Sequence, residues 1–370
     1  MSVEVAKAPR ARRRGRFDTD DRWMVSLVIL LVVELLYFNL GISSFWGGGW
    51  GGATSFLGES ESFLYGSMVA LGVMFVIFAG DIDLSVGYMA SFAGVMMAEF
   101  HIGGMNIWIA SVLSVVIAAV IGAVQGLVIT YFKLESLLVT LAGGYILNSA
   151  AVAWEGPVPP YNFPNSYDSA LGTGTLSSAI QIPNQLIIFA VLAVFATLLV
   201  HRTRFGRQLV LVGHNRHAAA YAGVRVSLTR IRAFALSATF SAIAGMCLAA
   251  NYGTARDDLG PVLLLPAITC VVLGGVDIFG GRGRVAGVII ATFIIGWLTP
   301  GLLDDGVNDT WTLMAPGILL LAALTIRGVV ERGKGVTFRD KLEARFGPTG
   351  GAVAAPTAAA PGGGGEQNVP

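Results

Sequence analysis

Apolar residues occur along this chain in ten long segments, which are separated by shorter polar segments. Most of them approach the length of about 20 residues that an α-helix needs to cross the hydrocarbon core of a bilayer. The segments at 86–101 and 285–299 are shorter, so we expect neighbouring helices to shield them from lipid. The pattern predicts an all-α polytopic membrane protein with about ten transmembrane helices. We expect these helices at 23–40, 64–80, 86–101, 107–131, 136–153, 183–200, 232–251, 263–279, 285–299 and 311–327.

Polar segments flank this apolar region at both ends. Residues 1–22 are basic and have no apolar periodicity, which is typical of a disordered tail. Residues 346–370 are rich in Gly, Pro and Ala, and this composition also predicts disorder. No small-residue cleavage pattern closely follows the first apolar segment, so we expect it to be retained as a span. The chain is therefore expected to have a tail at 1–22, a transmembrane domain at 23–328 and a second tail at 329–370.

The basic residues give this pattern a direction across the membrane. If residues 1–22 lie inside, each of the 24 Lys and Arg residues except Arg256 falls within or beside an inner segment. Cytoplasmic segments of membrane proteins carry an excess of Lys and Arg. The distribution therefore predicts that both termini are cytoplasmic. It also places inside the segment 201–232, which carries seven arginines and no Asp, Glu or Lys.

Composition supports a membrane environment and argues against several functions. The chain is 54% hydrophobic and 13% charged, whereas a soluble domain carries about 25% charged residues. A formal net charge of +1 gives no field that would attract nucleic acid. Cys247 and Cys270 lie inside apolar segments, where we expect packing residues and not a disulfide or metal site. The sequence has no Cys/His metal spacing and no nucleophile constellation, so we expect no metal, no cofactor and no catalysed covalent reaction.

The stretch Gly213–Gly223 predicts a short helix inside the segment 201–232. Asn215 can cap the free N–H groups at its start, alanines favour its interior, and Gly223 can take the left-handed conformation at its end. A short helix on a basic segment between spans is expected on the cytoplasmic face. The residues singled out here are Gly213, His214, Asn215, Arg216, Ala218, Ala219 and Gly223.

Two carboxylates, Asp81 and Asp83, interrupt the apolar sequence in the segment 80–87, with no cation nearby in the chain. Burying a carboxylate in a membrane protein is expensive, so such residues are functional candidates. The alternative is architectural, with Asp83 or Ser85 capping a helix that begins near Val86. The residue types favour the cap slightly and leave both interpretations open. The residues singled out in this turn are Asp81, Asp83, Ser85 and Gly87.

A second glycine-rich turn, at 274–284, echoes the first. Gly80-x-Ile82-Asp83 is matched by Gly274-x-Val276-Asp277, and Gly87 is matched by Gly281, each at an offset of 194. The match suggests an internal repeat. Gly274 and Gly275 would allow a tight turn and close helix packing, although a glycine-rich run with arginines can also hold phosphate. The sequence lacks a P-loop pattern, so we expect no nucleotide-hydrolysing site in this chain.

Three further polar or small residues, Gly143, Gly144 and Asn148, lie in the expected helix at 136–153. Paired glycines permit close packing or a kink, and Asn148 can bond across a helix interface or line a polar path. Packing is the more common role. Glu34 interrupts the first apolar segment and suggests proton coupling in principle. No histidine lies in the interior of an expected span to extend a relay, since His101 is at an outer helix end.

Five stretches, in this order, resemble the ribose-type branch of monosaccharide ABC-importer permeases. The stretch 80–87 is similar to the family's glycine–glycine–isoleucine–aspartate–leucine–serine signature, and Asp81 departs from it because the family usually has glycine there. The resemblance extends over about residues 64–328, and branched-chain amino acid permeases are more distantly related. The other stretches that carry it are 137–144, 203–207, 213–223 and 271–283.

The resemblance implies a type II-like ABC importer permease in the bacterial cytoplasmic membrane. In such importers a cytoplasmic helix of the permease docks on a separate ATP-binding subunit, and Gly213–Gly223 occupies that position here. The resemblance further implies an extracytoplasmic sugar-binding protein at the outer segments and a second permease subunit, in a homodimer or a heterodimer. The region 23–328 would then be the permease domain, with the coupling-helix loop at 201–232.

We therefore expect a permease for a monosaccharide or related small solute that is itself no enzyme. A proton-coupled secondary transporter, motivated by Glu34 and Asp81, is one alternative. A permease for a nucleoside or a branched-chain amino acid is another, and a structural membrane protein without solute flux is a third.

Overall fold

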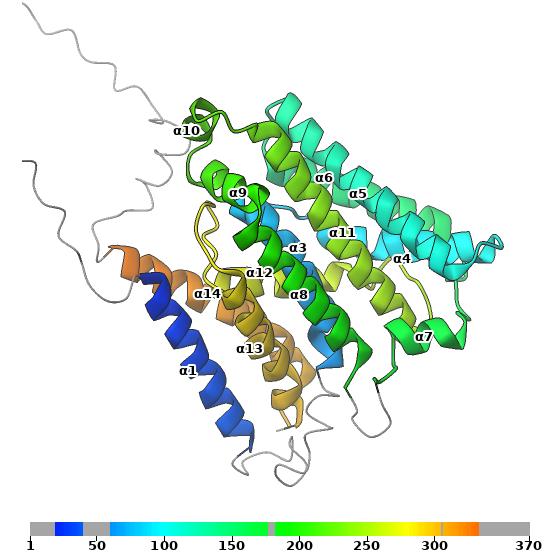
Figure 1. The fold of residues 1–370 in the computed structure, drawn as a ribbon. Helices are drawn as coiled ribbons and strands as arrows, with labels where there is room; N and C mark the ends of the chain where they lie inside the picture. The colour runs from blue at the N-terminus through cyan, green and yellow to red at the C-terminus, as the bar shows by residue number, and fades with distance from the viewer. Residues whose placement is uncertain (1–18, 40–59, 177–181, 305, 333–370) are drawn as a thin grey trace, which may run out of the picture. The chain divides into compact units, whose positions relative to one another are not determined.

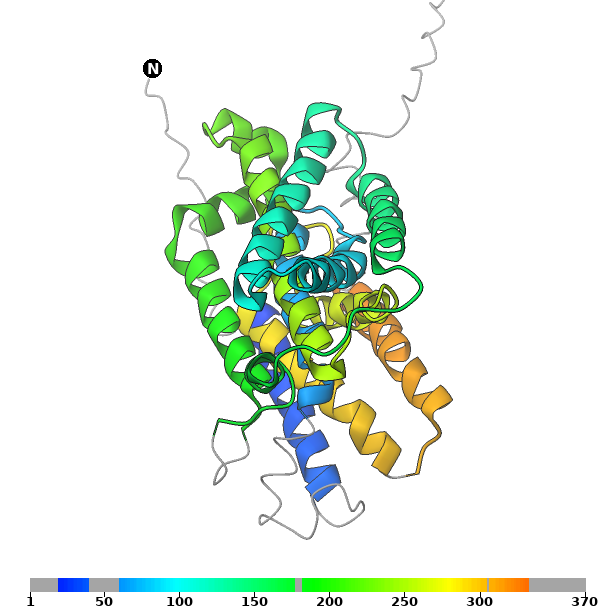
Figure 2. The ribbon, with the colours of Figure 1, turned by 90° about the vertical axis from the view of Figure 1, so that its right-hand side faces the viewer.

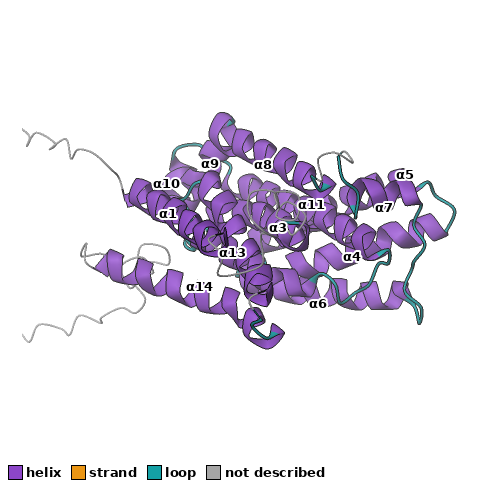
Figure 3. Cartoon of the chain, turned by 90° about the horizontal axis from the view of Figure 1, so that it is seen from below, coloured by secondary structure: helices purple, strands orange, loops and turns teal. Residues whose placement is uncertain are grey.

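The computed structural model describes residues 19–39, 60–176, 182–304 and 306–332. The described residues up to Ile326 form one compact unit, and residues 327–332 are the described part of a second. All the regular elements in the described residues are helices, apart from two isolated β-bridges (Figure 3). In chain order they are α1 (Thr19–Asn39), α3 (Glu61–Phe78), α4 (Val86–Ile102), α5 (Ile107–Tyr131), α6 (Ser136–Glu155), α7 (Asn165–Leu171), α8 (Asn184–Arg202), α9 (Arg204–His214), α10 (Arg216–Tyr221), α11 (Val226–Tyr252), the 3-10 helix η3 (Pro261–Leu263), α12 (Leu264–Leu273), α13 (Val285–Asp304) and α14 (Asp309–Arg332).

Each of the ten apolar segments forms a helix, and the boundaries differ most from the prediction, by six residues, in two places. Helix α11 begins at Val226 and not at 232, and α12 ends at Leu273 and not at 279. Five helices in the described part of the chain are long and apolar enough to cross a membrane, and the others are shorter or less apolar. The five are α5, α6, α8, α11 and α13. The fold is thus that of a polytopic helical membrane protein, while the number of ten crossings stays a prediction.

The centre of the bundle is formed by α3, α4 and α11. Nearly every residue of α3 and α4 is buried, and a helix that is apolar on all sides is stable only when it is enclosed. Helix α11 packs along α3, α4 and α5. Its contact with α5 is close because α5 presents small residues there: a Cβ on Gly122 would lie 2.5 Å from the Phe234 carbonyl oxygen. Small residues at helix interfaces are the usual route to close packing in membranes.

The outer helices expose apolar side chains on one face. On α5 these are Ile109, Val112, Val116, Val120 and Val124, which recur every three or four residues and therefore share a face. Helix α8 exposes Val191, Val194 and Leu198 in the same way. Such faces are suited to lipid, in which apolar side chains are at no disadvantage.

The two ends of the bundle carry different elements. Helices α9 and α10 lie at one end, and α7 lies at the opposite end (Figures 1 and 2). At the end with α7, Tyr167 is fully buried and its hydroxyl lies 3.0 Å from Ser111 Oγ of α5. The polar turns between α3 and α4 and between α12 and α13 reach the end that carries α9 and α10.

Candidate functional site

The segment between α3 and α4 is extended, and its side chains alternate in their surroundings. Asp81, Asp83 and Ser85 are buried, whereas Ile82 and Leu84 are only half-buried. Gly80, with a φ of 73°, ends α3: its N–H donates to Ile77 and that of Asp81 to Val76. This is the Schellman pattern, which needs a residue that tolerates the left-handed conformation. The glycine therefore turns the chain from a helix into an extended segment.

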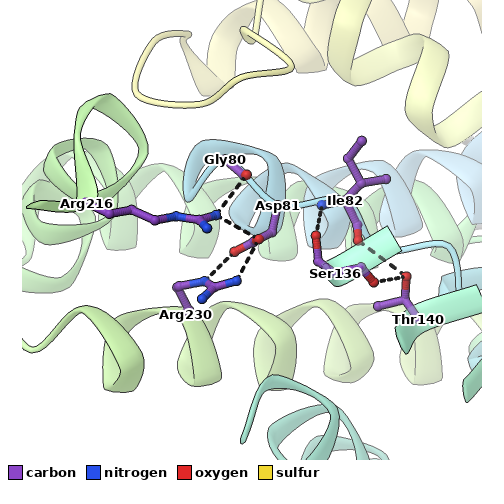
Figure 4. Close-up of polar contacts among 7 residues, drawn as sticks. All are labelled: Gly80, Asp81, Ile82, Ser136, Thr140, Arg216 and Arg230. Atoms are coloured by element: carbon purple, nitrogen blue, oxygen red, sulfur yellow. Dashed lines mark hydrogen bonds and ion pairs between the residues drawn. The ribbon is translucent and has the colours of Figure 1, made fainter. Parts of the chain in front are cut away.

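Asp81 is held by two arginines from other parts of the chain. Arg230 Nε lies 2.6 Å from Asp81 Oδ2, and Arg230 Nη2 lies 2.9 Å from Asp81 Oδ1. Arg216 Nη2 donates to Asp81 Oδ1 at 2.8 Å and to the Gly80 carbonyl oxygen at 3.1 Å (Figure 4). The carboxylate is 2% exposed, so it depends on these partners to offset its desolvation. The sequence places no cation beside Asp81, but the fold supplies two.

Asp83, two residues later, is satisfied by neutral donors. Its Oδ1 accepts from the Ser85 backbone N–H at 3.0 Å and lies 2.6 Å from Ser85 Oγ, and its Oδ2 accepts from Ser237 Oγ of α11 at 2.8 Å. Ser85 Oγ also lies 3.1 Å from Gln125 Oε1 of α5. Burial raises the pKa of Asp83, and the hydrogen bonds from Ser85 and Ser237 partly lower it. Asp83 thus closes a turn at the start of α4, whereas Ser85, the other predicted cap, makes no side-chain cap bond to the helix.

Helix α6 holds the same segment through its backbone. The N–H of Ile82 donates to Ser136 Oγ at 3.1 Å, and that of Leu84 donates to Thr140 Oγ1 at 3.1 Å. Figure 4 shows Ser136 and Thr140 beside Ile82, on the other side of the segment from the two arginines. Because Ser136 and Thr140 are four residues apart, they lie on one face of their helix. The extended segment is therefore fastened to α11 through its carboxylates and to α6 through its N–H groups.

The predicted short helix exists, and it is α10. Asn215 accepts from the Ala218 N–H at 2.9 Å, as predicted for an N-cap, and Gly223 ends the turn with a φ of 80°. Ala219 is only 3% exposed and packs inward, whereas Tyr221 is 93% exposed. The helix thus presents an aromatic side chain outward, a residue that the sequence reasoning did not single out.

The segment 201–232 is more helical than a loop with one short helix. It contains the whole of α9, all of α10 and the first turns of α11. Gly213 and His214 belong to the end of α9 and not to the short helix. A Cβ on Gly213 would overlap the Phe78 carbonyl oxygen and the Gly281 nitrogen, so Gly213 serves close backbone packing.

The second glycine-rich turn lies against the first. The Gly281 N–H donates to the Phe78 carbonyl oxygen at 3.0 Å, and a Cβ on Gly280 would lie 2.5 Å from the Gly80 nitrogen. A Cβ on Gly274 would lie 2.6 Å from the Val288 Cα. Gly274 therefore lets the end of α12 pack closely on the start of α13.

The two turns share local structure, with a shift of one residue inside the match. Gly275, with a φ of 87°, makes the same Schellman bonds after α12 as Gly80 makes after α3, so these glycines correspond at an offset of 195 and not 194. Asp277 accepts from the Phe279 N–H at 3.1 Å as Asp83 accepts from Ser85, which keeps the offset of 194. The second turn is thus one residue shorter between its glycine and its aspartate.

Gly143 and Gly144 are packing residues in the structure. A Cβ on Gly143 would overlap the Gln125 amide of α5, and one on Gly144 would lie 2.6 Å from Tyr88 Cδ2 of α4. Asn148 is half-buried and makes no side-chain hydrogen bond to another residue of the described ranges.

Several site residues escaped sequence reasoning. Arg230 and Ser237 are seven residues apart and so share a face of α11. The predicted start at 232 left Arg230 outside this helix, and so this spacing was missed. The paired hydroxyls of α6, Ser136 and Thr140, carry a similar four-residue signal. The described residues contain no group of three or more His, Cys, Asp or Glu that could hold a metal ion, and Cys247 and Cys270 are buried free thiols.

The bundle and its buried polar turns define a polytopic membrane protein. Residues 61–324 match the family model described as branched-chain amino acid transport system / permease component. The chain belongs to this family of ABC-importer permeases, as the resemblance of its motifs indicated. It is therefore a multi-pass protein of the cytoplasmic membrane and a transporter component.

Among individual proteins, the chain is similar to autoinducer 2 import system permease proteins LsrD. That of Salmonella paratyphi B is 30% identical over 309 residues, which is 83% of this chain and 92% of the relative. That of Enterobacter sp. is 31% identical over 319 residues, with 83% and 93% covered. That of Photorhabdus luminescens is 29% identical, with 83% and 91% covered. No solved structure gives a significant match.

Proposed function

We propose that this chain is the permease subunit of an ABC importer that moves a monosaccharide or related small solute into the cytoplasm. The family membership supports the transport role, and the relatives named for autoinducer 2 import favour a small non-peptide solute. ATP would be hydrolysed by a separate cytoplasmic subunit. An extracytoplasmic binding protein would deliver the solute, and a second permease subunit would complete the pathway.

The observation that carries the link to an ATPase is the construction of α10. Arg216 anchors its first turn to the segment 80–81, and Ala219 faces inward, while the Tyr221 ring is almost wholly exposed. A short helix that is fixed at its base and presents a bare aromatic at its tip is suited to seating in a groove of a partner. The other exposed residues from the start of α10 to the turn after it are His217, Ala218, Ala220, Ala222 and Gly223. All but His217 are small, so a partner can approach the helix closely.

The docking role is tested by co-purification of the ATPase with the tagged permease. Tyr221→Glu places a charge at the tip without touching the anchor, and we expect the amount of retained ATPase to fall about tenfold or more. Tyr161→Glu alters an exposed tyrosine of the outer segment and should leave ATPase retention unchanged. Equal retention of ATPase by the wild type and the Tyr221 variant would refute the docking role of α10. Ala219 is a poor site for this test, because a large substituent there would disrupt the packing of the helix itself.

The solute is the second question, since the family description mentions branched-chain amino acids while the individual relatives are named for autoinducer 2 import. Calorimetric titration of the partner binding protein with sugars, nucleosides and branched-chain amino acids decides between them. We expect affinity for a sugar-like solute. Tight binding of leucine or valine alone would instead assign the chain to amino acid import.

One observation favours a proton-coupled transporter as the competing function. Both carboxylate oxygens of Glu34 on α1 are buried without a hydrogen-bond partner among the described residues. Asp81, the other residue behind that hypothesis, is instead engaged in ion pairs with Arg216 and Arg230. Uptake into proteoliposomes that continues with ATP and an uncoupler supports the importer. Uptake that stops with the uncoupler at constant ATP supports proton coupling.

A further inference from the structure

We propose that Asp81 is the positioning residue through which α10 moves the helices of the permease. This inference rests on the proposed function, because it assumes that an ATPase acts on α10. It goes further by assigning the path: from Arg216, through the Asp81 carboxylate and the backbone of the turn, into α4 and α11. Asp81 would thus transmit movement without touching the solute.

The first step of the path is the shared carboxylate. Arg216 comes from the first turn of α10 and Arg230 from the second turn of α11, and both bind the same Asp81 side chain. Arg216 also holds the Gly80 carbonyl oxygen with the nitrogen that binds Asp81. A displacement of α10 therefore pulls on the side chain and the backbone of the turn together. Charge-assisted bonds of this kind are stronger than neutral ones.

The second step is the attachment of the turn to its neighbours. The residues that follow Asp81 are bonded alternately to α6 and α11, through Ile82, Asp83 and Leu84. Val86, directly after this segment, begins α4. Each of the four residues 81–84 is hydrogen-bonded to a neighbouring helix, so the segment is held rigidly. A displacement of Asp81 is therefore transmitted to the start of α4 and is not absorbed by a flexible loop.

The third step links the same movement to the second turn. Gly213, at the end of α9, lies against the Phe78 carbonyl oxygen and Gly281, and a Cβ on Gly281 would lie 2.6 Å from the His214 nitrogen. Backbone meets backbone here without intervening side chains, a contact that repacking cannot easily relieve. The second turn leads directly into α13, which begins at Val285. Both polar turns therefore rest on the junction between α9 and α10.

The test compares variants at Asp81 and Arg216 in proteoliposomes that contain the ATPase and the binding protein. For each variant, solute uptake and ATP hydrolysis are measured together. We expect Asp81→Asn and Arg216→Gln to lower the number of solute molecules moved per ATP hydrolysed at least fivefold. Loss of fold would lower uptake and hydrolysis in parallel, so the ratio separates a positioning role from a structural one.

Arg216→Gln is the sharper variant because Arg216 is half-exposed and Asp81 keeps its bonds to Arg230. Arg216→Lys retains the positive charge, so its number of solute molecules moved per ATP should be closer to the wild-type value than that of Arg216→Gln. The double variant Asp81→Asn/Arg216→Gln should be only slightly worse than Asp81→Asn, because both changes remove the bond between the two side chains and the double variant additionally loses only the Arg216 bond to the Gly80 carbonyl oxygen. Glu135→Gln alters an exposed carboxylate before α6 and serves as the control. It should move as many solute molecules per ATP as the wild type.

Two results would overturn the proposal in distinguishable ways. An unchanged ratio in Arg216→Gln and Asp81→Asn, with normal wild-type transport, would remove the role of Asp81 and leave the importer function intact. A wild-type complex that shows no ATP-driven uptake of any solute would remove the proposed function and this inference with it.

Discussion

At the scale of single residues, Asp81 and Asp83 show how neighbouring carboxylates acquire different properties from one fold. They are two residues apart in an extended segment, so both point toward α11. Asp81 binds the guanidinium groups of Arg230 on α11 and Arg216 on α10, whereas Asp83 binds the hydroxyl of Ser237 on α11 and the hydroxyl and N–H of Ser85 in its own turn. Asp81 therefore forms ion pairs, whereas Asp83 accepts hydrogen bonds from uncharged groups that shape the turn. Substitutions at the two positions should therefore have different consequences.

Asp83→Asn should retain more than half of the wild-type transport. An asparagine keeps one oxygen to accept from the Ser85 N–H and can donate its amide to Ser237 Oγ, so the turn before α4 survives. Transport assays in proteoliposomes at one pH check this. If transport is abolished while expression and folding are normal, the carboxylate itself acts in transport and the architectural interpretation of Asp83 is wrong.

The same variant should also change the pH dependence of stability. The pKa of Asp83 is raised in the folded state, so the folded chain binds this proton more tightly than the unfolded chain. Stability is then highest below the ordinary Asp pKa of about 3.9 and falls as pH rises toward the raised pKa. Unfolding in detergent across this range should show a flatter pH profile for Asp83→Asn than for the wild type.

Arg230→Met should destabilise the fold by about 3 kcal/mol, at the lower end of the range for breaking a buried ion pair. The side chain of Arg230 is nearly buried, and its loss removes both of its bonds to the buried Asp81 carboxylate. Chemical unfolding in detergent measures the difference. Arg232→Met, on the exposed side of the same helix, should change stability by no more than about 0.5 kcal/mol. Equal stabilities of the two variants would show that the Asp81 bonds contribute little.

At the scale of elements, the junction of α9, α10 and the two polar turns depends on glycines because three backbones meet there. Gly213→Ala should destabilise the fold by about 2 kcal/mol, within the range for overpacking a filled site. The added methyl group would overlap the Phe78 carbonyl oxygen and break its bond to Gly281. Thermal unfolding in detergent provides the measurement.

Gly317→Ala is the matched control for that substitution. Gly317 lies inside α14, and no described atom lies within 4 Å of a Cβ built on it. Alanine is favoured over glycine in a helix by about 0.5–1 kcal/mol, so this variant should be as stable as the wild type or slightly more stable. If Gly213→Ala is as stable as Gly317→Ala, the close contact of the end of α9 with the two polar turns does not contribute to stability.

At the scale of the whole molecule, the apolar pattern was sufficient to locate the helices of the ten apolar segments, but not α7 and α9 or the polar partners of the helices. Helix α5 could be predicted to the residue because its apolar run and its helix coincide. The start of α11 could not, because its first two turns carry Arg230 and Arg232 and read as part of a basic loop. The pairing of Asp81 with Arg230 joins positions 149 residues apart, and no local pattern encodes such a distance. The exposure of Tyr221 likewise follows from the packing of its neighbours and not from its own sequence context.

The orientation of the molecule in the membrane is the last prediction, and impermeant thiol labelling in whole cells tests it. Single cysteines at the exposed positions Tyr131, Val158 and Tyr221 are separated by α6 and α8, each long and apolar enough for one crossing. We expect Val158→Cys to be labelled in intact cells, and Tyr131→Cys and Tyr221→Cys only after permeabilisation, because the arginines around α9 and α10 favour the cytoplasm. Cys247 and Cys270 are buried, so their background should be low. Labelling of Tyr221→Cys in intact cells would put α10 outside, beyond the reach of a cytoplasmic ATPase. Labelling of Val158→Cys and Tyr221→Cys from the same side would show that α8 does not cross.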